Sequence, residues 1–237
     1  MSSTKTSPPG DLSDSLVTVV SGATGGIGRA IARAMDGDQL VLLGRDEAGL
    51  AEAGAAHPTA LVRKVDYLSE ASIKDAFQDL GRIDRLVHCT GAVAMAPIAD
   101  LSSGRLKEMM NANFFAPFAV TQAALHLLRL ARGMVVFVNS GAGKRVRPGW
   151  TGYAASKFAV RALAEGLSEE EPNLRVLSVF CGAVDTPMRA SLGEKRGVDY
   201  RAGDYLTADE VASAVLYATQ TRSEVAIREI EIRMRNT

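Results

Sequence analysis

The chain has 237 residues, of which 47% are hydrophobic and 23% are charged, a composition typical of one soluble globular domain. Its 27 basic and 27 acidic residues give a formal net charge of zero, which argues against nucleic acid or an anionic membrane as the main partner. No apolar run approaches the roughly 20 residues that a membrane span requires.

The two cysteines, Cys89 and Cys181, lie in apolar runs and lack the spacing of a metal site. Buried free thiols and no metal are therefore expected, and a reducing, cytoplasmic compartment fits. Residues 1–15 are polar and lack the apolar segment of a signal peptide, so they predict a disordered tail. Because no repeats or interior linkers occur, a single domain is expected over residues 16–237.

The first predicted strand leads directly into a glycine-rich turn. The short apolar run from Leu16 to Val20 is followed by SGATGGIG and then by apolar residues at helical spacing. A strand, a glycine turn and a helix in this order are typical of a phosphate-binding loop, where free N–H groups face a pyrophosphate. A tight turn that binds no ligand is the alternative.

The second predicted strand, 39–43, ends in Gly44, Arg45 and Asp46. An NAD site usually has an acid about 20 residues after the glycine turn, where it binds the ribose 2′-hydroxyl. Gly44 takes that place here and Arg45 follows, which favours the 2′-phosphate of NADP(H), because arginine pairs with phosphate through two hydrogen bonds. Arg29 could add to this contact. The alternatives are that Asp46 is the ribose acid, or that Arg45 is a solvated loop charge.

Five further strands are predicted along the chain. Apolar and β-branched runs place them at 60–65, 84–89, 134–138, 174–180 and 224–234. In the last run the apolar positions change phase near Arg228, which predicts a β-bulge. Strands that alternate with helices predict an α/β fold, a doubly wound parallel sheet of about seven strands with helices on both faces.

Two of the predicted helices carry polar signals. Periodicity predicts one helix over 69–80, with Ser69 as its cap, and a long helix over 106–130 that is apolar on more than one face. The long helix is therefore expected to contact another subunit as well as the sheet. Asparagine is unfavourable inside a helix, so Asn111 or Asn113 is expected to have a polar role, a local bend being the alternative.

The C-terminal third contains a loop and a helix start. Residues 188–205 are charged and interrupted by glycines, and they predict a mobile loop. Thr207 is followed three residues later by Glu210, which is typical of a capping box at the start of a helix.

Parallel sheets of this kind bind ligands beyond the carboxyl ends of their strands. Asp66 could accept a hydrogen bond from an adenine amino group, and a glycine at position 91 lets the chain pass close to a cofactor. The residues that follow predicted strands are expected to meet at this one edge, and they are Gly22, Arg45, Asp66, Gly91, Ser140 and Gly182.

Three residues near the fifth predicted strand provide groups for proton transfer. Ser140 ends the apolar run, and Tyr153 and Lys157 are four residues apart, on one face of a helix. An ammonium beside a phenol favours the phenolate, so the pKa of Tyr153 is predicted to lie below its usual value of about 10. Such a tyrosine can exchange a proton with an alcohol or carbonyl oxygen that Ser140 holds.

These motifs resemble those of the short-chain dehydrogenase/reductase family over about residues 16–234. The turn SGATGGIG is similar to the family's TGxxxGIG. Ser140, Tyr153 and Lys157 resemble its Ser and Tyr-x-x-x-Lys signature, including the 13-residue gap from serine to tyrosine. Asn113, in NANFFAPF, matches the family's catalytic asparagine.

The resemblance implies a Rossmann-type fold and hydride transfer between NADP(H), preferred over NAD(H), and a carbonyl or secondary alcohol. It implies that Tyr153 donates the proton and that Lys157 binds the nicotinamide ribose and lowers the pKa of Tyr153. Ser140 would hold the substrate oxygen, and Asn113 would anchor a water between Lys157 and solvent. The implied cofactor-binding residues are Gly22, Thr24, Gly26, Ile27, Gly28, Arg45, Asp66, Gly91, Tyr153, Lys157, Gly182, Val184 and Thr186.

Two turns depart from the family pattern. The family's Asn-Asn-Ala-Gly is here His88-Cys89-Thr90-Gly91, which changes the local hydrogen bonding. Its Pro-Gly is here Cys181-Gly182, which removes the fixed backbone angle of proline. Neither change removes a group that performs chemistry.

Two other classes of function compete with a reductase. A sensor or scaffold could bind NADP(H) without turning it over, because fold does not fix function. A serine hydrolase using Ser140 would lack the G-x-S-x-G motif and a histidine in a motif context. His88 is expected in a strand, and His57 and His126 are expected on surfaces.

The expected partner is a small-molecule carbonyl or alcohol substrate, in a homodimer or homotetramer. The substrate pocket would be framed by residues 141–150, 93–98 and 188–205 and would be partly apolar. Arginines in these segments could meet an anionic group or simply be solvated, and they are Arg145, Arg147 and Arg189.

Overall fold

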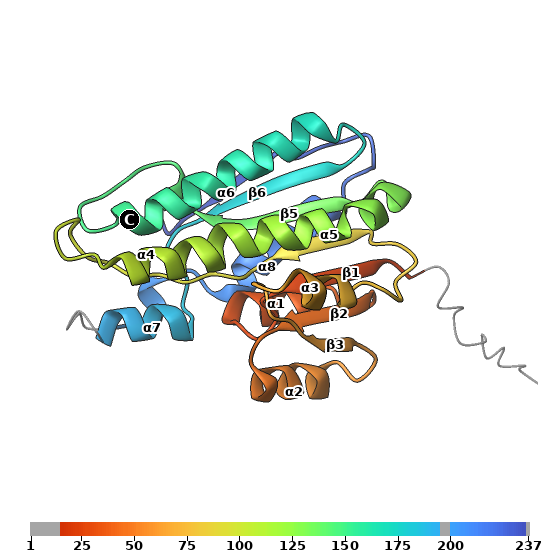
Figure 1. Cartoon of the computed structure of the whole chain (residues 1–237), viewed down its shortest axis with the longest axis horizontal. Coiled ribbons are helices and arrows are strands. Elements are labelled where there is room, and N and C mark those ends of the chain that lie inside the picture. Colours follow the sequence, from red (N-terminus) through yellow and green to blue (C-terminus); the bar gives the residue numbers. More distant parts are fainter. Residues whose placement is uncertain (1–14, 195–199, 236–237) are drawn as a thin grey trace, which may run out of the picture.

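The computed structural model describes residues 15–194 and 200–235, so the predicted tail, except for Ser15, lies outside the described residues. Its centre is a sheet of seven parallel strands in the order β3-β2-β1-β4-β5-β6-β7, which confirms the predicted fold class (Figure 1). The strands are β1 Val17–Ser21, β2 Gln39–Gly44, β3 Leu61–Lys64, β4 Arg85–His88, β5 Met134–Ser140, β6 Arg175–Cys181 and β7 Glu229–Ile232.

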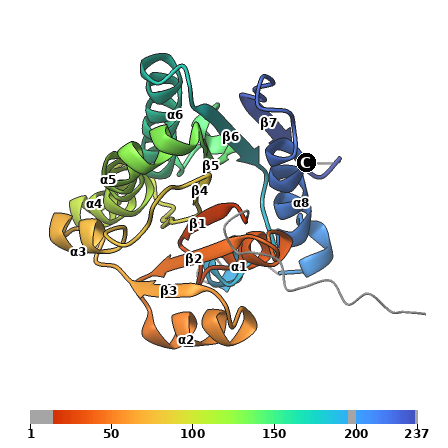
Figure 2. The ribbon, with the colours of Figure 1, turned by 90° about the vertical axis from the view of Figure 1, so that its right-hand side faces the viewer.

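Helices cover both faces of the sheet. Figure 2 shows α3, α4, α5 and α6 on one side and α1 and α8 on the other, with α2 beside β3. The helices are α1 Gly26–Ala34, α2 Glu47–Ala56, α3 Glu70–Asp75, α4 Ser103–Met110, α5 Ala116–Ala131, α6 Thr151–Glu170, α7 Pro187–Glu194 and α8 Ala208–Thr219.

Each central strand contributes to two hydrophobic cores, because successive side chains of a strand point to opposite faces. Val19 packs in the core beneath α5 and α6, and Val20 packs in the core beneath α1 and α8. Strands buried on both faces read as continuous apolar runs, which is why β1 and β5 could be recognised in the sequence.

The strand order reverses between β1 and β4. The chain builds outward from β1 to β2 and β3, and then returns to β4 on the other side of β1. In a doubly wound sheet this reversal opens a crevice at the carboxyl ends of the strands, where ligands bind. Helix α7 lies beyond that edge (Figure 1).

The predicted long helix runs continuously from Ser103 to Ala131, with a π-helical turn at Asn111–Phe115 between α4 and α5. One face packs on the sheet, whereas Phe115 and Phe118 are exposed, so the expectation of a second apolar face is confirmed. This helix is long and apolar enough to cross a membrane by length and composition alone. The core helix of a soluble protein meets the same two criteria.

Two predicted segments differ in length from the observed elements. The helix predicted over 69–80 ends at Asp75, although Ser69 caps it as expected by accepting a hydrogen bond from the Ser72 amide. The chain continues in tight turns that still bury Phe77. The loop predicted over 188–205 is wrong for its first part, which forms α7. Pro187 has the backbone angle of a first helical turn and starts that helix.

The bulge predicted near Arg228 is also wrong. Strand β7 begins only at Glu229, and its register with β6 is continuous from Ser178 opposite Glu229 to Cys181 opposite Ile232. The change of apolar phase therefore marks the start of the strand. The capping box of α8 is confirmed, since Thr207 and Glu210 exchange both hydrogen bonds.

The cysteines are free, as expected, with Cys181 buried and Cys89 half-buried. Among the histidines, His88 lies in β4 and His126 is exposed, as predicted. His57 was expected on the surface and is instead buried at the end of α2.

Candidate active site

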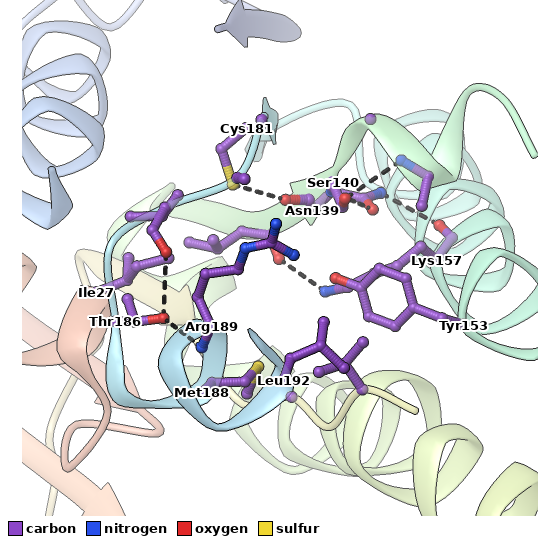
Figure 3. Close-up of a pocket in the computed structure, with 18 of the residues that line it drawn as sticks. Ile27, Asn139, Ser140, Tyr153, Lys157, Cys181, Thr186, Met188, Arg189 and Leu192 are labelled. Carbon is purple, nitrogen blue, oxygen red and sulfur yellow. Dashed lines mark hydrogen bonds between the residues drawn. The ribbon is translucent and has the colours of Figure 1, made fainter. Parts of the chain in front are cut away.

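A cavity of about 400 Å³ opens beyond the carboxyl ends of the strands, and Figure 3 shows 18 of the residues that line it. All four predicted catalytic residues line this cavity, namely Asn113, Ser140, Tyr153 and Lys157. It also brings together five predicted cofactor residues, Ile27, Gly91, Gly182, Val184 and Thr186. The other predicted cofactor residues lie on the same edge of the sheet outside the cavity wall, and they are Gly22, Thr24, Gly26, Gly28, Arg45 and Asp66.

The glycine turn between β1 and α1 is packed too tightly for side chains. Gly22 has a φ of +78°, and a Cβ there would lie 2.7 Å from the Thr90 backbone nitrogen. A Cβ on Gly28 would lie 2.3 Å from the Gly22 carbonyl oxygen. No side chain caps the N-terminus of α1 at Gly25, so its free N–H groups face the edge where ligands bind.

Arg45 and Asp46, at the end of β2, have different environments. The Asp46 carboxylate caps α2 by accepting a hydrogen bond of 2.7 Å from the Gly49 amide. Arg45 is exposed and forms no hydrogen bond or ion pair with another described residue. Arg29, the second predicted contact, pairs with Glu52 at 2.7 Å.

Asp66 is exposed after β3, and its carboxylate accepts a hydrogen bond of 3.0 Å from the Leu68 amide. This local bond orients the carboxylate while leaving it open to solvent. Behind the glycine turn, the buried Tyr67 hydroxyl accepts a hydrogen bond of 3.3 Å from the Gly22 amide. Burial raises the pKa of Tyr67 to about 12, so this support stays neutral at ordinary pH.

Asn113, and not Asn111, is the buried asparagine of the long helix, and it lies in the π-helical turn. Its side-chain oxygen accepts from the Ala92 amide at 2.7 Å, and its amide nitrogen donates to the Ala92 carbonyl at 2.9 Å and to Ser156 Oγ at 2.8 Å. Both N–H groups are thereby used, so the polar role predicted for an asparagine includes fixing the turn after β4 against α6.

Ser140 is the last residue of β5 and opens a 3₁₀ turn over Gly141–Gly143. Its Oγ accepts from the Ala142 amide at 3.2 Å, and its own amide donates to Asn139 Oδ1 at 2.8 Å. Asn139 Nδ2 in turn donates to the Lys157 carbonyl at 3.2 Å. This chain of bonds ties the end of β5 to the helix that carries Tyr153.

Tyr153 and Lys157 lie one turn apart on α6, as predicted, and both face the cavity (Figure 3). The Lys157 ammonium is 5.9 Å from the centre of the Tyr153 ring and donates a hydrogen bond of 3.1 Å to the Val138 carbonyl. Trp150 packs edge-on against Tyr153, with ring centres 5.7 Å apart.

The prediction of a lowered Tyr153 pKa is wrong for the protein alone. Burial, the largest effect, raises the pKa of Tyr153 above its usual value, although the Ser140 side chain acts in the opposite direction. Burial also lowers the pKa of Lys157. Desolvation disfavours the charged form of each group, and it is the largest effect on the pKa of both.

The two turns that depart from the family pattern are held by other contacts. Cys89 donates its amide to the Ser21 carbonyl at 2.8 Å, and His88 Nε2 lies 2.9 Å from Thr121 Oγ1. Cys181 continues β6 by one residue, paired with Ser140 on one side and Ile232 on the other. Strand pairing therefore replaces the restraint that proline would give.

Four residues of the site were not predicted from the sequence, and they are Tyr67, Asn139, Ser156 and Arg233. Tyr67, Asn139 and Ser156 act through the hydrogen bonds described above, and Ser156 also donates to the Tyr153 carbonyl at 2.7 Å. Arg233, just after β7, lines the cavity. Only the polar pair Asn139-Ser140 at the end of an apolar run could have drawn attention to one of them.

A family model described as short chain dehydrogenase matches residues 16–197, most of the chain. The chain belongs to the short-chain dehydrogenase family. An uncharacterised oxidoreductase from Staphylococcus epidermidis is 32% identical over 227 residues, an alignment that covers 92% of this chain and 96% of that one. This short-chain dehydrogenase is therefore related along nearly its full length to an oxidoreductase.

Solved structures of other proteins are also similar to this chain. An alcohol dehydrogenase from Thermococcus sibiricus complexed with 5-hydroxy-NADP is 26% identical, with a TM-score of 0.82 and coverage of 92% of this chain and 96% of that chain. A variant of actinorhodin polyketide ketoreductase with NADPH is 27% identical, with a TM-score of 0.84 and coverage of 93% and 96%. The Rossmann-type fold of the short-chain dehydrogenase is thus shared with both.

The buried His88 predicts an acid sensitivity. Burial lowers the pKa of His88 to about 3 from 6.5, so the unfolded chain binds the proton more readily than the folded one. Its contribution to stability is therefore complete above about pH 6.5 and is lost as the pH falls toward about 3. We expect the stability difference between wild type and His88→Asn to shrink by up to about 1.4 kcal/mol per pH unit below pH 6.5.

Urea unfolding at several pH values would measure this difference. The matched control is His126→Asn, because His126 is exposed and its loss is expected to leave the pH dependence of wild type intact. If the free energy of unfolding changed with pH in the same way for wild type and His88→Asn, the lowered pKa of His88 would be contradicted.

Proposed function

We propose that the chain is an NADP(H)-dependent oxidoreductase that reduces a carbonyl group to a secondary alcohol. The observation that carries the proposal is that Ser140, Tyr153 and Lys157 face one cavity at the edge where the glycine turn and the uncapped start of α1 lie. Membership of an oxidoreductase family supports it.

The edge of the sheet fits a dinucleotide. Side chains are excluded at Gly22 and Gly28, and the free N–H groups of α1 suit a pyrophosphate. Ile27, Gly91 and Thr186 line the cavity between this turn and Tyr153. When bound, the nicotinamide would supply or accept the hydride, and the protein would orient it and handle the proton.

Arg45 supports NADP(H) over NAD(H). Its guanidinium has no ionic partner among the described residues, whereas the neighbouring Asp46 carboxylate is used as the cap of α2. A free arginine and an occupied acid suit a 2′-phosphate better than a ribose hydroxyl. The two solved structures with NADP-type ligands agree with this preference.

In the reductive direction, Ser140 would hold the carbonyl oxygen and Tyr153 would donate the proton to it. Because the protein alone raises the pKa of Tyr153, the phenol is stored in the protonated form that a reduction requires. Lys157, fixed by the Val138 carbonyl, would bind the nicotinamide ribose and stabilise the phenolate that remains. A positive nicotinamide ring beside it would act in the same direction.

Exposed aromatic side chains support a homodimer or homotetramer. Phe115 and Phe118 on the long helix and Phe158 on α6 are 50%, 43% and 40% exposed, although each is a large hydrophobic residue. A second copy of the chain would cover such a surface.

Two free thiols fit a cytoplasmic location.

The proton donor can be tested by Tyr153→Phe. Removing the hydroxyl leaves the other cofactor contacts in place, so we expect nearly unchanged NADPH binding and a loss of turnover of about 10²–10⁴. The measurement is NADPH oxidation with a panel of ketones, beside NADPH affinity from fluorescence. Tyr217→Phe is the matched control, because Tyr217 is exposed on α8 and its variant should keep full activity. Equal turnover in the Tyr153→Phe variant would refute the assignment and favour a sensor that only binds NADP(H).

The cofactor preference can be tested by Arg45→Ala. A charged hydrogen bond contributes about 1.5–3 kcal/mol, so the variant should lose about 10- to 100-fold in NADPH affinity and keep its NADH affinity. Thermal stabilisation at equal ligand concentrations measures both. Arg33→Ala, at an exposed arginine of α1 that pairs with Asp209, is the control. Stronger stabilisation of wild type by NADH would show that Asp46 binds the ribose.

A further inference from the structure

The cavity that holds Ser140 and Tyr153 has arginine side chains on its opposite wall and rim. Arg189 extends from α7, and Figure 3 shows its guanidinium reaching across the cavity toward the side on which Ser140 and Tyr153 lie. Arg233, from the end of β7, approaches the Ser140 turn, because its Nη2 would lie 3.1 Å from a Cβ on Gly141.

The charge of Arg189 has no counterion among the described residues. Its Nη2 donates a long bond of 3.4 Å to the Tyr205 hydroxyl, and its guanidinium stacks 4.8 Å from the centre of that ring. Its Nε is buried and has no hydrogen-bond partner among residues 15–194 and 200–235. A half-buried guanidinium whose hydrogen-bond partner is a neutral phenol, with no ion pair to a described residue, leaves donors available for an anion.

Most other arginines in the described part of the chain form ion pairs with an aspartate or glutamate. Arg63 contacts Asp79 at 2.7 Å, and Arg85 contacts Asp38 at 2.6 Å. Arg233 pairs with Glu231 at 2.5 Å, but its Nε is also buried, without a hydrogen-bond partner in the described part of the chain. Arg189 thus lines the cavity without an ion pair to any described residue.

The other charged residues around the cavity do not neutralise the charge of Arg189. Arg145 and Arg147 are exposed on its rim, and Lys157 lies in its depth. Asp204 is the acidic residue among the lining residues, and it is exposed and forms no ion pair with Arg189. The cavity therefore has an excess of positive charge, although the whole chain is formally neutral.

We propose that the substrate carries an anionic group, a carboxylate or a phosphate, and that Arg189 binds it while the carbonyl oxygen lies between Ser140 and Tyr153. The reducible carbonyl rests on the proposed function, whereas the anion site rests on Arg189 alone. In the reaction, a hydride from NADPH forms the new C–H bond and the Tyr153 proton completes the hydroxyl, so the anionic ketone becomes an anionic alcohol and NADP⁺ is released.

Trp150 allows the anion site to be tested without turnover. It is the single tryptophan of the chain, and it lines the cavity beside Tyr153. We would titrate its fluorescence, in saturating NADP⁺, with acetoacetate, benzoylacetate and phenylpyruvate, each beside its methyl ester. Dihydroxyacetone phosphate beside dihydroxyacetone forms the phosphate arm. The variants are Arg189→Gln, the charge-conserving Arg189→Lys, and Arg228→Gln as the control, because Arg228 is exposed and pairs with Glu169.

We expect at least one anion to bind about 10- to 100-fold more tightly than its neutral counterpart. Arg189→Gln should abolish that preference without changing the affinity for NADP⁺ or for the neutral ligand. Arg189→Lys should keep part of it, and Arg228→Gln should behave as wild type. The arm with the larger preference identifies the group as carboxylate or phosphate.

Equal binding of charged and neutral ligands would overturn the proposal. So would an Arg189→Gln variant that keeps the preference or weakens NADP⁺ instead, which would make Arg189 a cofactor residue. An anion preference that depends on Arg189, without NADPH oxidation by any ligand that binds, would support the anion site and count against the proposed reductase. The two failures are therefore distinguishable.

Discussion

The seven strands pair in parallel, and this constraint brings every strand end to the same edge of the sheet. Loops after β1, β4, β5 and β6 then meet, although they come from residues more than a hundred positions apart in the chain. The reversal of strand order beside β1 leaves a crevice between them. If the strands were antiparallel, the glycine turn and the helix that carries Tyr153 could lie at opposite edges of the sheet.

Burial then determines the chemistry of that site. Tyr153 and Lys157 are held in a region where charge is disfavoured, so the protein alone favours a neutral phenol. A charged cofactor would change this balance when it binds. Asn139 and Ser156 donate hydrogen bonds to the backbone carbonyls of Lys157 and Tyr153, and so fix the helical turn that carries both side chains. The pKa of Tyr153 therefore depends on whether a positively charged nicotinamide ring lies beside it.

Local pattern was enough to predict much of the fold and part of the site. The apolar run before Gly22 and the four-residue step from Tyr153 to Lys157 are local features, and both were interpreted correctly as strand-turn-helix and as one helix face. Helix α7 was missed because it is short and has little periodicity. The last strand was predicted too long, because an apolar residue before it packs on the core without pairing.

Other features depend on contacts that sequence distance hides. The roles of Asn139 and Ser156 exist only once α6 packs against β5. The direction of the Tyr153 pKa could not be inferred from the nearby lysine, because it depends on how much water the whole cavity wall excludes. Arg189 was noted as a cation in the sequence, but only the structure shows that it lines the cavity and has no counterion within the described part of the chain.

We propose that Tyr153 ionises at working pH only when an oxidised nicotinamide lies beside it. An ultraviolet pH titration of tyrosinate, taken as the difference between wild type and Tyr153→Phe with and without NADP⁺, measures it directly. We predict that NADP⁺ shifts the ionisation of Tyr153 to clearly lower pH. An identical titration with and without bound NADP⁺ would contradict the account.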